Sequence, residues 1–72
     1  MKVLYKFDIE NQQPYKSNEE IFAEADRITE EEANRQGWVN AHAKLDALGS
    51  AQGKMWYYFV VIGEDLEEGH SN

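Results

Sequence analysis

The chain of 72 residues contains no cysteine and only one proline. Without thiols it can form neither a disulfide framework nor a thiolate metal site, which fits a reducing cytosol. No apolar run approaches the roughly 18 residues that a membrane span needs. The first acidic residues, Asp8 and Glu10, follow the N-terminus too closely for a signal peptide. We therefore expect a cytoplasmic protein that does not bind membranes.

The sequence also lacks the motifs of catalysis and of cofactor binding. It has no glycine-rich phosphate loop, no His-Glu-x-x-His zinc motif and no EF-hand loop. No serine has a histidine nearby in the sequence that could activate it as a nucleophile, and so small a domain has little room for a deep pocket. We expect a protein that is not an enzyme and holds no cofactor.

One pair of residues has metal-ligand spacing. His42 and Asp46 are four residues apart, so on a helix they could share a divalent metal. No third ligand follows from the pattern, and a surface histidine beside a carboxylate explains the pair better. Glu30, Glu31 and Glu32 lack the glycine turn of a calcium loop. We therefore predict no metal site.

Acidic residues dominate the charge of the chain. The net charge is −7, from 14 acids against 7 lysines and arginines. Seven acids fall between residues 19 and 32, and four more between 64 and 68. Such a chain is repelled by nucleic-acid phosphates, which argues against direct nucleic-acid binding. A basic protein surface is a better partner, although solubility alone also explains an acidic surface.

Two stretches have the pattern of strands. Residues 3–9 alternate, with Val3, Tyr5, Phe7 and Ile9 predicted on one side. Residues 55–62 form the strongest predicted strand, and both of its faces are apolar. Met55, Tyr57, Phe59 and Val61 point one way, whereas Trp56, Tyr58, Val60 and Ile62 point the other way.

The region between these strands has two interpretations. Ser17 and Glu20 form a capping box, and a helix over residues 19–28 would place its apolar residues on one face: Ile21, Phe22, Ala25 and Ile28. A second capping box, Thr29 to Glu32, nevertheless predicts a helix start only one residue later. A strand that runs straight into this start is simpler than two helices without a connection. We therefore predict a strand over residues 20–27 and a helix from Thr29 to Leu48, with Gly37 inside it and Gly49 as its C-terminal cap.

These elements predict an α+β fold in one domain, residues 1–63. A hairpin, a crossover helix and a last strand give the order β-β-α-β, with an antiparallel three-stranded sheet packed by one main helix and the first strand at its centre. The alternative is β-α-α-β with a two-stranded sheet. Residues 64–72 are acidic and have no pattern, which predicts a disordered tail.

The last strand carries the functional expectation. One helix covers only one face of a sheet, so Trp56 and Tyr58, together with Leu4, would form an exposed patch of the kind found at protein interfaces. Covering of this face by a loop, the tail or Trp38 is the other possibility. If the strand lies at an edge, it could also pair with a second copy.

We predict a non-enzymatic module that binds a protein partner, such as a nucleic-acid-binding protein that it inhibits by presenting carboxylates in place of phosphates. The predicted contacts are Trp56, Tyr58, Glu24, Asp26, Glu30 and Glu31. The alternative is a structural role as a homodimer or as a subunit of an assembly. In size, charge and expected architecture, and in no specific motif, the chain resembles small phage-encoded host-takeover and anti-defence proteins.

Overall fold

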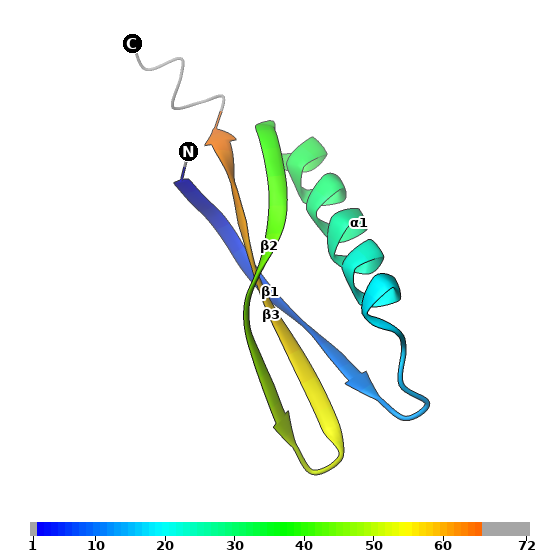
Figure 1. Ribbon diagram of the computed structural model, residues 1–72. Helices are drawn as coiled ribbons and strands as arrows, with labels where there is room; N and C mark the ends of the chain where they lie inside the picture. The colour runs from blue at the N-terminus through cyan, green and yellow to red at the C-terminus, as the bar shows by residue number, and fades with distance from the viewer. Residues whose placement is uncertain (1, 66–72) are drawn as a thin grey trace.

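The computed structural model describes residues 2–65 as one helix and three strands (Figure 1). In chain order these are β1 (Lys2–Gln12), α1 (Asn18–Gln36), β2 (Trp38–Ala51) and β3 (Lys54–Asp65). The first two residues of the predicted tail, at positions 64 and 65, belong to β3, and residues 66–72 lie outside the described part. No helix within residues 2–65 is long and apolar enough to cross a membrane.

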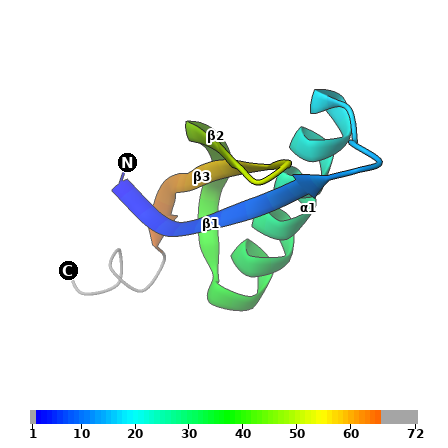
Figure 2. The ribbon, with the colours of Figure 1, turned by 90° about the horizontal axis from the view of Figure 1, so that it is seen from below.

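The three strands form one antiparallel sheet in the order β1-β3-β2, and α1 packs on one side of it (Figure 2). The predicted fold class, an α+β domain with a three-stranded antiparallel sheet and one main helix, is confirmed. The chain order, however, is β-α-β-β rather than β-β-α-β. The central strand is β3 and not the first strand, so β3 offers no free edge for pairing with a second copy.

The predicted strand at residues 20–27 is wrong, because these residues belong to α1. The capping box that favours the helix is present: the backbone N–H of Glu20 donates to Ser17 Oγ at 3.2 Å, and that of Ser17 donates to Glu20 Oε1 at 3.0 Å. Thr29 is buried inside the helix, and its hydroxyl donates to the carbonyl oxygen of Ala25 at 2.8 Å. A threonine that bonds back by four residues does not cap a new helix.

The predicted helix from Thr29 to Leu48 is correct only as far as Gln36. Gly37 is the C-terminal cap of α1 rather than an interior residue: its φ of 78° lies in the left-handed region, and its N–H donates to the carbonyl oxygen of Ala33 at 2.8 Å. Glycine adopts this conformation without a Cβ penalty, which explains why the helix ends here. Gly49, the predicted cap, lies within β2.

β2 alternates between half-buried and exposed residues from Val39 to Leu45. Its Ala, Lys and Leu content is typical of helices, so the period of two is the only local sign of a strand. β2 turns into β3 through Gln52 and Gly53, whose φ angles of 54° and 77° are both positive. This is the pattern of a tight hairpin turn whose twist matches that of the strands.

β1 confirms the predicted strand but not the shared face of its apolar residues. A register shift between Val3 and Tyr5 leaves Leu4 as an extra residue. Tyr5 pairs with Val61 on the helix side of the sheet, whereas Val3 pairs with Ile62 on the other side. A bulge inserts one residue and so reverses the alternation beyond it.

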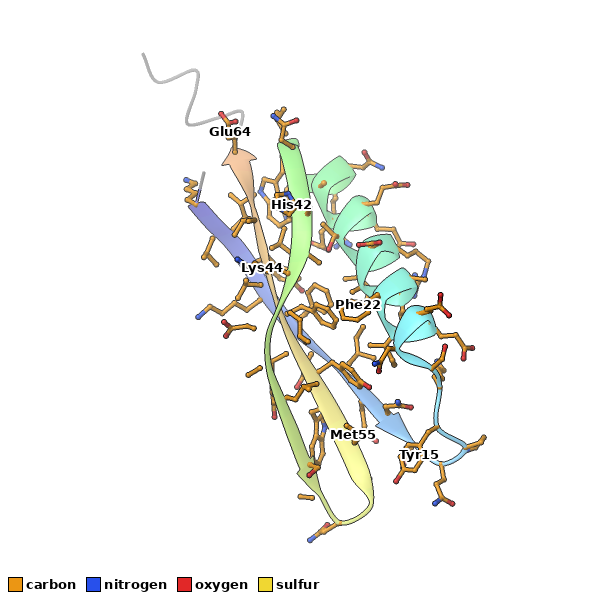
Figure 3. The ribbon with its side chains drawn as sticks, viewed as in Figure 1. Tyr15, Phe22, His42, Lys44, Met55 and Glu64 are labelled. Atoms are coloured by element: carbon orange, nitrogen blue, oxygen red, sulfur yellow. The ribbon has the colours of Figure 1, made fainter. Side chains whose placement is uncertain are left out.

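The core lies between α1 and one face of the sheet. Phe59, at the centre of β3, stacks on Phe7 with ring centroids 5.4 Å apart, and it forms a T-shaped pair with Phe22 with ring centroids 5.7 Å apart. Phe22 points from α1 toward the sheet in Figure 3. The helix contributes residues spaced by four, as an amphipathic helix must. The buried apolar residues are Ile9, Ile21, Ala25, Tyr57, Phe59 and Val61.

Polar contacts fix the start of α1 against the strands. The side chain of Asn11, only 3% exposed, donates to the carbonyl oxygen of Lys16 at 3.1 Å and accepts from its N–H at 2.9 Å, which closes the β1–α1 loop. The Tyr57 hydroxyl donates to Asn18 Oδ1 at 2.7 Å. Within the same loop, Tyr15 reaches the hairpin turn and donates to the carbonyl oxygen of Gly53 at 2.6 Å.

Near the other end of β3, Gly63 lets β2 approach closely. A Cβ at this position would lie 2.9 Å from Ala41 Cα and 3.1 Å from both Leu4 Cδ1 and the carbonyl oxygen of Val39. Two of these three neighbours are backbone atoms, which cannot move aside cheaply. The glycine is therefore required by the second bulge, between Val39 and His42.

We expect Gly63→Ala to lower the free energy of unfolding by about 1–3 kcal/mol, the usual range for overpacking. Urea denaturation followed by circular dichroism measures this change. Ser50→Ala, at an exposed position of β2, is the control and should change stability by less than about 0.5 kcal/mol. Equal stabilities of the Gly63 and Ser50 variants would contradict the close approach of the strands.

The helix cap also predicts a pH dependence. The backbone N–H of Ser17, and secondly its hydroxyl, lower the pKa of Glu20 below its ordinary value. A carboxylate whose pKa is lower in the folded state stabilises the fold above its unfolded pKa, and this contribution is lost as the pH falls through the folded pKa. We expect Glu20→Gln to be less stable than the native chain at neutral pH, with a difference that shrinks below about pH 4.5. Urea titrations at several pH values test this, with Glu64→Gln as the control; a difference independent of pH would rule out the linkage.

Candidate functional site

The six residues predicted to bind a partner lie on two opposite surfaces. Glu24, Asp26, Glu30 and Glu31 are on α1. Trp56 and Tyr58 are on β3 and face away from the helix, because they alternate with the buried residues Tyr57 and Phe59. One flat partner surface therefore cannot contact both groups, and each surface requires its own explanation.

The sheet surface that faces away from α1, here the helix-free face, has a central apolar row along β3. The row consists of Trp56, Tyr58, Val60 and Ile62, and Val3 of β1 joins it beside Ile62. Tyr58 is 41% exposed and Val3 is 54% exposed, and no element within residues 2–65 covers this face (Figure 2). Trp38 does not cover this face, because its ring packs against the ring of Tyr5 on the helix side, with the ring centroids 6.0 Å apart. Leu4 lies against Gly63 and not beside Trp56.

Charged residues flank this apolar row in an ordered way. Val60 pairs with Lys6 of β1 on one side and with Lys44 of β2 on the other. Cross-strand partners share a face of the sheet, so two lysines bracket Val60. Lys44 is labelled on β2 in Figure 3.

The neighbouring position along β3 has the opposite charge. Tyr58 pairs with Asp8 on the β1 side, and on the β2 side it pairs with Ala47, directly after the extra residue Asp46 of a bulge. Asp46 lines the same hollow as Asp8 and Tyr58. Two aspartates therefore bracket Tyr58, about 7 Å along the strand from the two lysines.

The hollow itself has a volume of about 430 Å³ and lies at the centre of the helix-free face, where Asp46 bulges out of β2. The Tyr58 ring leans over Gly49, whose missing side chain leaves it room: a Cβ there would lie 3.3 Å from Tyr58 Cε2. Residues from all three strands line it: Lys6, Phe7, Asp8, Asp46, Ala47, Tyr58, Phe59 and Val60.

The second surface is the exposed side of α1. The helix contains seven of the twelve acids within residues 2–65 but only two of the seven lysines and arginines. The helix thus has a net charge of −5, while the other described residues balance at five acids and five bases. The charge of the described domain is therefore a property of this one element.

Several of these carboxylates already have partners. Lys16 Nζ lies 3.4 Å from Glu24 Oε1, and Arg27 lies 3.2 Å from Glu31 Oε2. Arg35 pairs with Glu32, and Glu20 belongs to the capping box. Of the predicted contacts, Glu24 and Glu31 therefore reach a partner only in competition with an internal ion pair.

Asp26 and Glu30 form no ion pair within the described residues, and both are exposed. They are one turn apart and line a groove of about 460 Å³ between α1 and the beginning of β2. Thr29, Ala33, Asn34, Trp38, Asn40, Ala41 and His42 complete its lining. Two carboxylates beside an indole ring and two amides match a lysine or arginine side chain in charge and in hydrogen bonding.

In the structure, His42 and Asp46 do not lie one helical turn apart, as two metal ligands on a helix would. Both residues lie in β2, where four residues span about 13 Å rather than one helical turn. The His42 ring is exposed, and its Nδ1 lies 3.3 Å from the carbonyl oxygen of Asn40. Within residues 2–65 no three His, Asp or Glu side chains are grouped so that they could hold a metal ion.

Sequence reasoning missed two groups of residues. Lys6, Asp8, Lys44 and Asp46 acquire their arrangement only from the pairing of three strands and from a bulge. Trp38 and Asn34 belong to the groove because the helix ends at Gly37 and the chain returns along the sheet. The left-handed cap at Gly37, followed by alternation in residues 39–45, is the sequence signal that could have placed them.

Searches of family models, curated proteins and solved structures found no match to this chain.

Proposed function

We propose that this protein is a non-enzymatic binding module that docks its acidic helix on a basic protein surface in the cytoplasm. The partner is a nucleic-acid-binding protein, and binding inhibits it because carboxylates occupy the place of phosphates. Such an inhibitor has the role of a phage-type anti-defence or host-takeover protein. The observation that carries the proposal is the concentration of the net charge on α1.

The charge distribution supports binding to a protein better than it supports solubility alone. An acidic surface needed only for solubility would spread over all elements, whereas here the sheet and loops are electrically balanced. Asp26 and Glu30 lack internal ion pairs in the described residues, so they can pair with a cation without breaking an existing contact. A negative potential concentrated on one side also steers association toward a basic partner.

The groove adds a specific contact to this general attraction. A lysine or arginine of the partner would enter between Asp26 and Glu30 and lie against Trp38, which lines the same groove. Pairing with two carboxylates at one site discriminates among basic surfaces, since only a suitably projecting side chain reaches both. On this proposal Trp38 and Asn34 join Asp26 and Glu30 as contact residues.

A displacement assay tests the proposal. Proteins from a lysate of the native source are loaded on DNA-cellulose, and the purified chain is added at constant salt. We expect it to release a defined set of DNA-binding proteins, which mass spectrometry identifies. The double variant Asp26→Asn, Glu30→Gln should release them at least about tenfold less efficiently, because it removes the two unpaired charges of the groove.

The control variant, Glu64→Gln with Glu67→Gln, removes the same number of charges outside the helix and should act like the native chain. Equal loss in both variants would show that net charge alone matters and would overturn the role of the groove. Failure of the native chain to release any protein would overturn the proposed inhibition.

A further inference from the structure

The helix-free face combines three properties that the acidic helix does not explain. Its centre is an apolar row, Trp56 to Ile62 along alternate residues of β3. The residues that flank the centre of this row are charged. Lys6 and Lys44 lie beside Val60. Asp8 and Asp46 lie beside Tyr58. None of these four charged side chains forms an ion pair within residues 2–65.

We propose that a second copy of this chain occupies the helix-free face, forming a symmetric dimer in which two sheets pack face to face. The charge pattern is complementary to itself, which is what a two-fold interface requires. A partner of one charge sign would meet repulsion either from the lysine pair or from the aspartate pair. A second copy, rotated by 180°, can place its aspartate pair opposite the lysine pair and its lysine pair opposite the aspartate pair.

The pattern also selects the symmetry axis. An axis that lies between the sheets, perpendicular to β3 and opposite Phe59, places Val60 of one copy over Tyr58 of the other. The same rotation keeps β1 over β1 and β2 over β2. Lys6 then faces Asp8 of the second copy, and Lys44 faces Asp46, each of these contacts occurring twice. An axis parallel to β3 would instead place lysines over lysines.

The position of α1 favours the same arrangement. In each chain the acidic helix packs on the side of the sheet opposite the helix-free face (Figure 2). The two helices would therefore lie on the outside of the dimer. The net charge of −5 on each helix is thus kept away from the interface, where the described residues balance. The dimer also leaves both grooves at Asp26 and Glu30 open, so it is compatible with the proposed function without depending on it.

The area of the helix-free face determines the affinity that we expect for the dimer. Three strands about 4.8 Å apart, used over about nine residues, give a face roughly 15 Å wide and 30 Å long. Two copies therefore bury on the order of 1,000 Å², the lower end of specific interfaces. We expect a weak dimer, with dissociation in the micromolar range.

Sedimentation equilibrium from about 10 to 500 µM tests the proposal in that range. The native chain should shift from the 8.4 kDa monomer toward twice that mass. Lys44→Glu alone and Asp46→Lys alone should each raise the dissociation constant about tenfold or more, because each creates two like-charge contacts across the axis. The double variant Lys44→Glu, Asp46→Lys should recover dimerisation, because the reversed charges again face each other.

Glu19→Lys, which makes the same change of two charges at an exposed position of α1 on the outer side of the dimer, is the control and should leave the dimer intact. A native chain that remains monomeric overturns the proposal. If Tyr58 of that monomer also resists hydroxyl-radical oxidation, residues 66–72 are the occupant; if Tyr58 is oxidised, the face serves a different protein. A dimer unaffected by the single variants, or not recovered by the double variant, overturns the assigned face and axis.

Discussion

The packing of Phe59 against α1 is the interaction on which the rest of the structure depends. Phe59 lies at the centre of the central strand and contacts Phe7 on β1 and Phe22 on the helix. It therefore joins the helix to the sheet at the middle of a domain that measures 49 × 17 × 15 Å. Because the only helix of the described domain is used on this face, the opposite face is left without a covering layer.

This constraint places the two proposed binding surfaces on opposite sides of the domain. The covered side places the acidic surface of α1 outward, with the unpaired carboxylates of Asp26 and Glu30 beside the groove. The uncovered side presents an apolar row whose flanking charges balance. The described elements of the chain provide no second layer, and we therefore propose that a second copy covers the outer face of the central strand, which is apolar on both faces.

The sequence alone predicts β1, β3 and the α+β class, because a period of two in apolar residues is strong there. It predicts the two-faced apolarity of β3 for the same reason. It misplaces the middle of the chain because two local signals compete. Thr29 has the residues of a capping box but bonds back to Ala25, and residues 38–48 combine helix-forming composition with strand alternation. Tertiary pairing with β3 decides the outcome for β2.

The candidate surfaces were less predictable than the fold. Individual residues such as Trp56, Tyr58 and Asp26 follow from composition and pattern. Their separation onto opposite sides does not, because it requires the position of the helix relative to the sheet. The alternation of two lysines with two aspartates is even harder to predict from the sequence, because bulges at Leu4 and Asp46 shift the register of both edge strands. The four residues are Lys6, Lys44, Asp8 and Asp46.

The most direct test of the proposed dimer is a dilution series followed by ¹H–¹⁵N correlation spectra. We expect the concentration-dependent shifts to map to the helix-free face, around Lys44, Tyr58 and Val60, while the amides of α1 remain unchanged. Shifts centred on α1, or spectra that do not change with concentration, would contradict the claim that the uncovered face of the sheet binds a second copy.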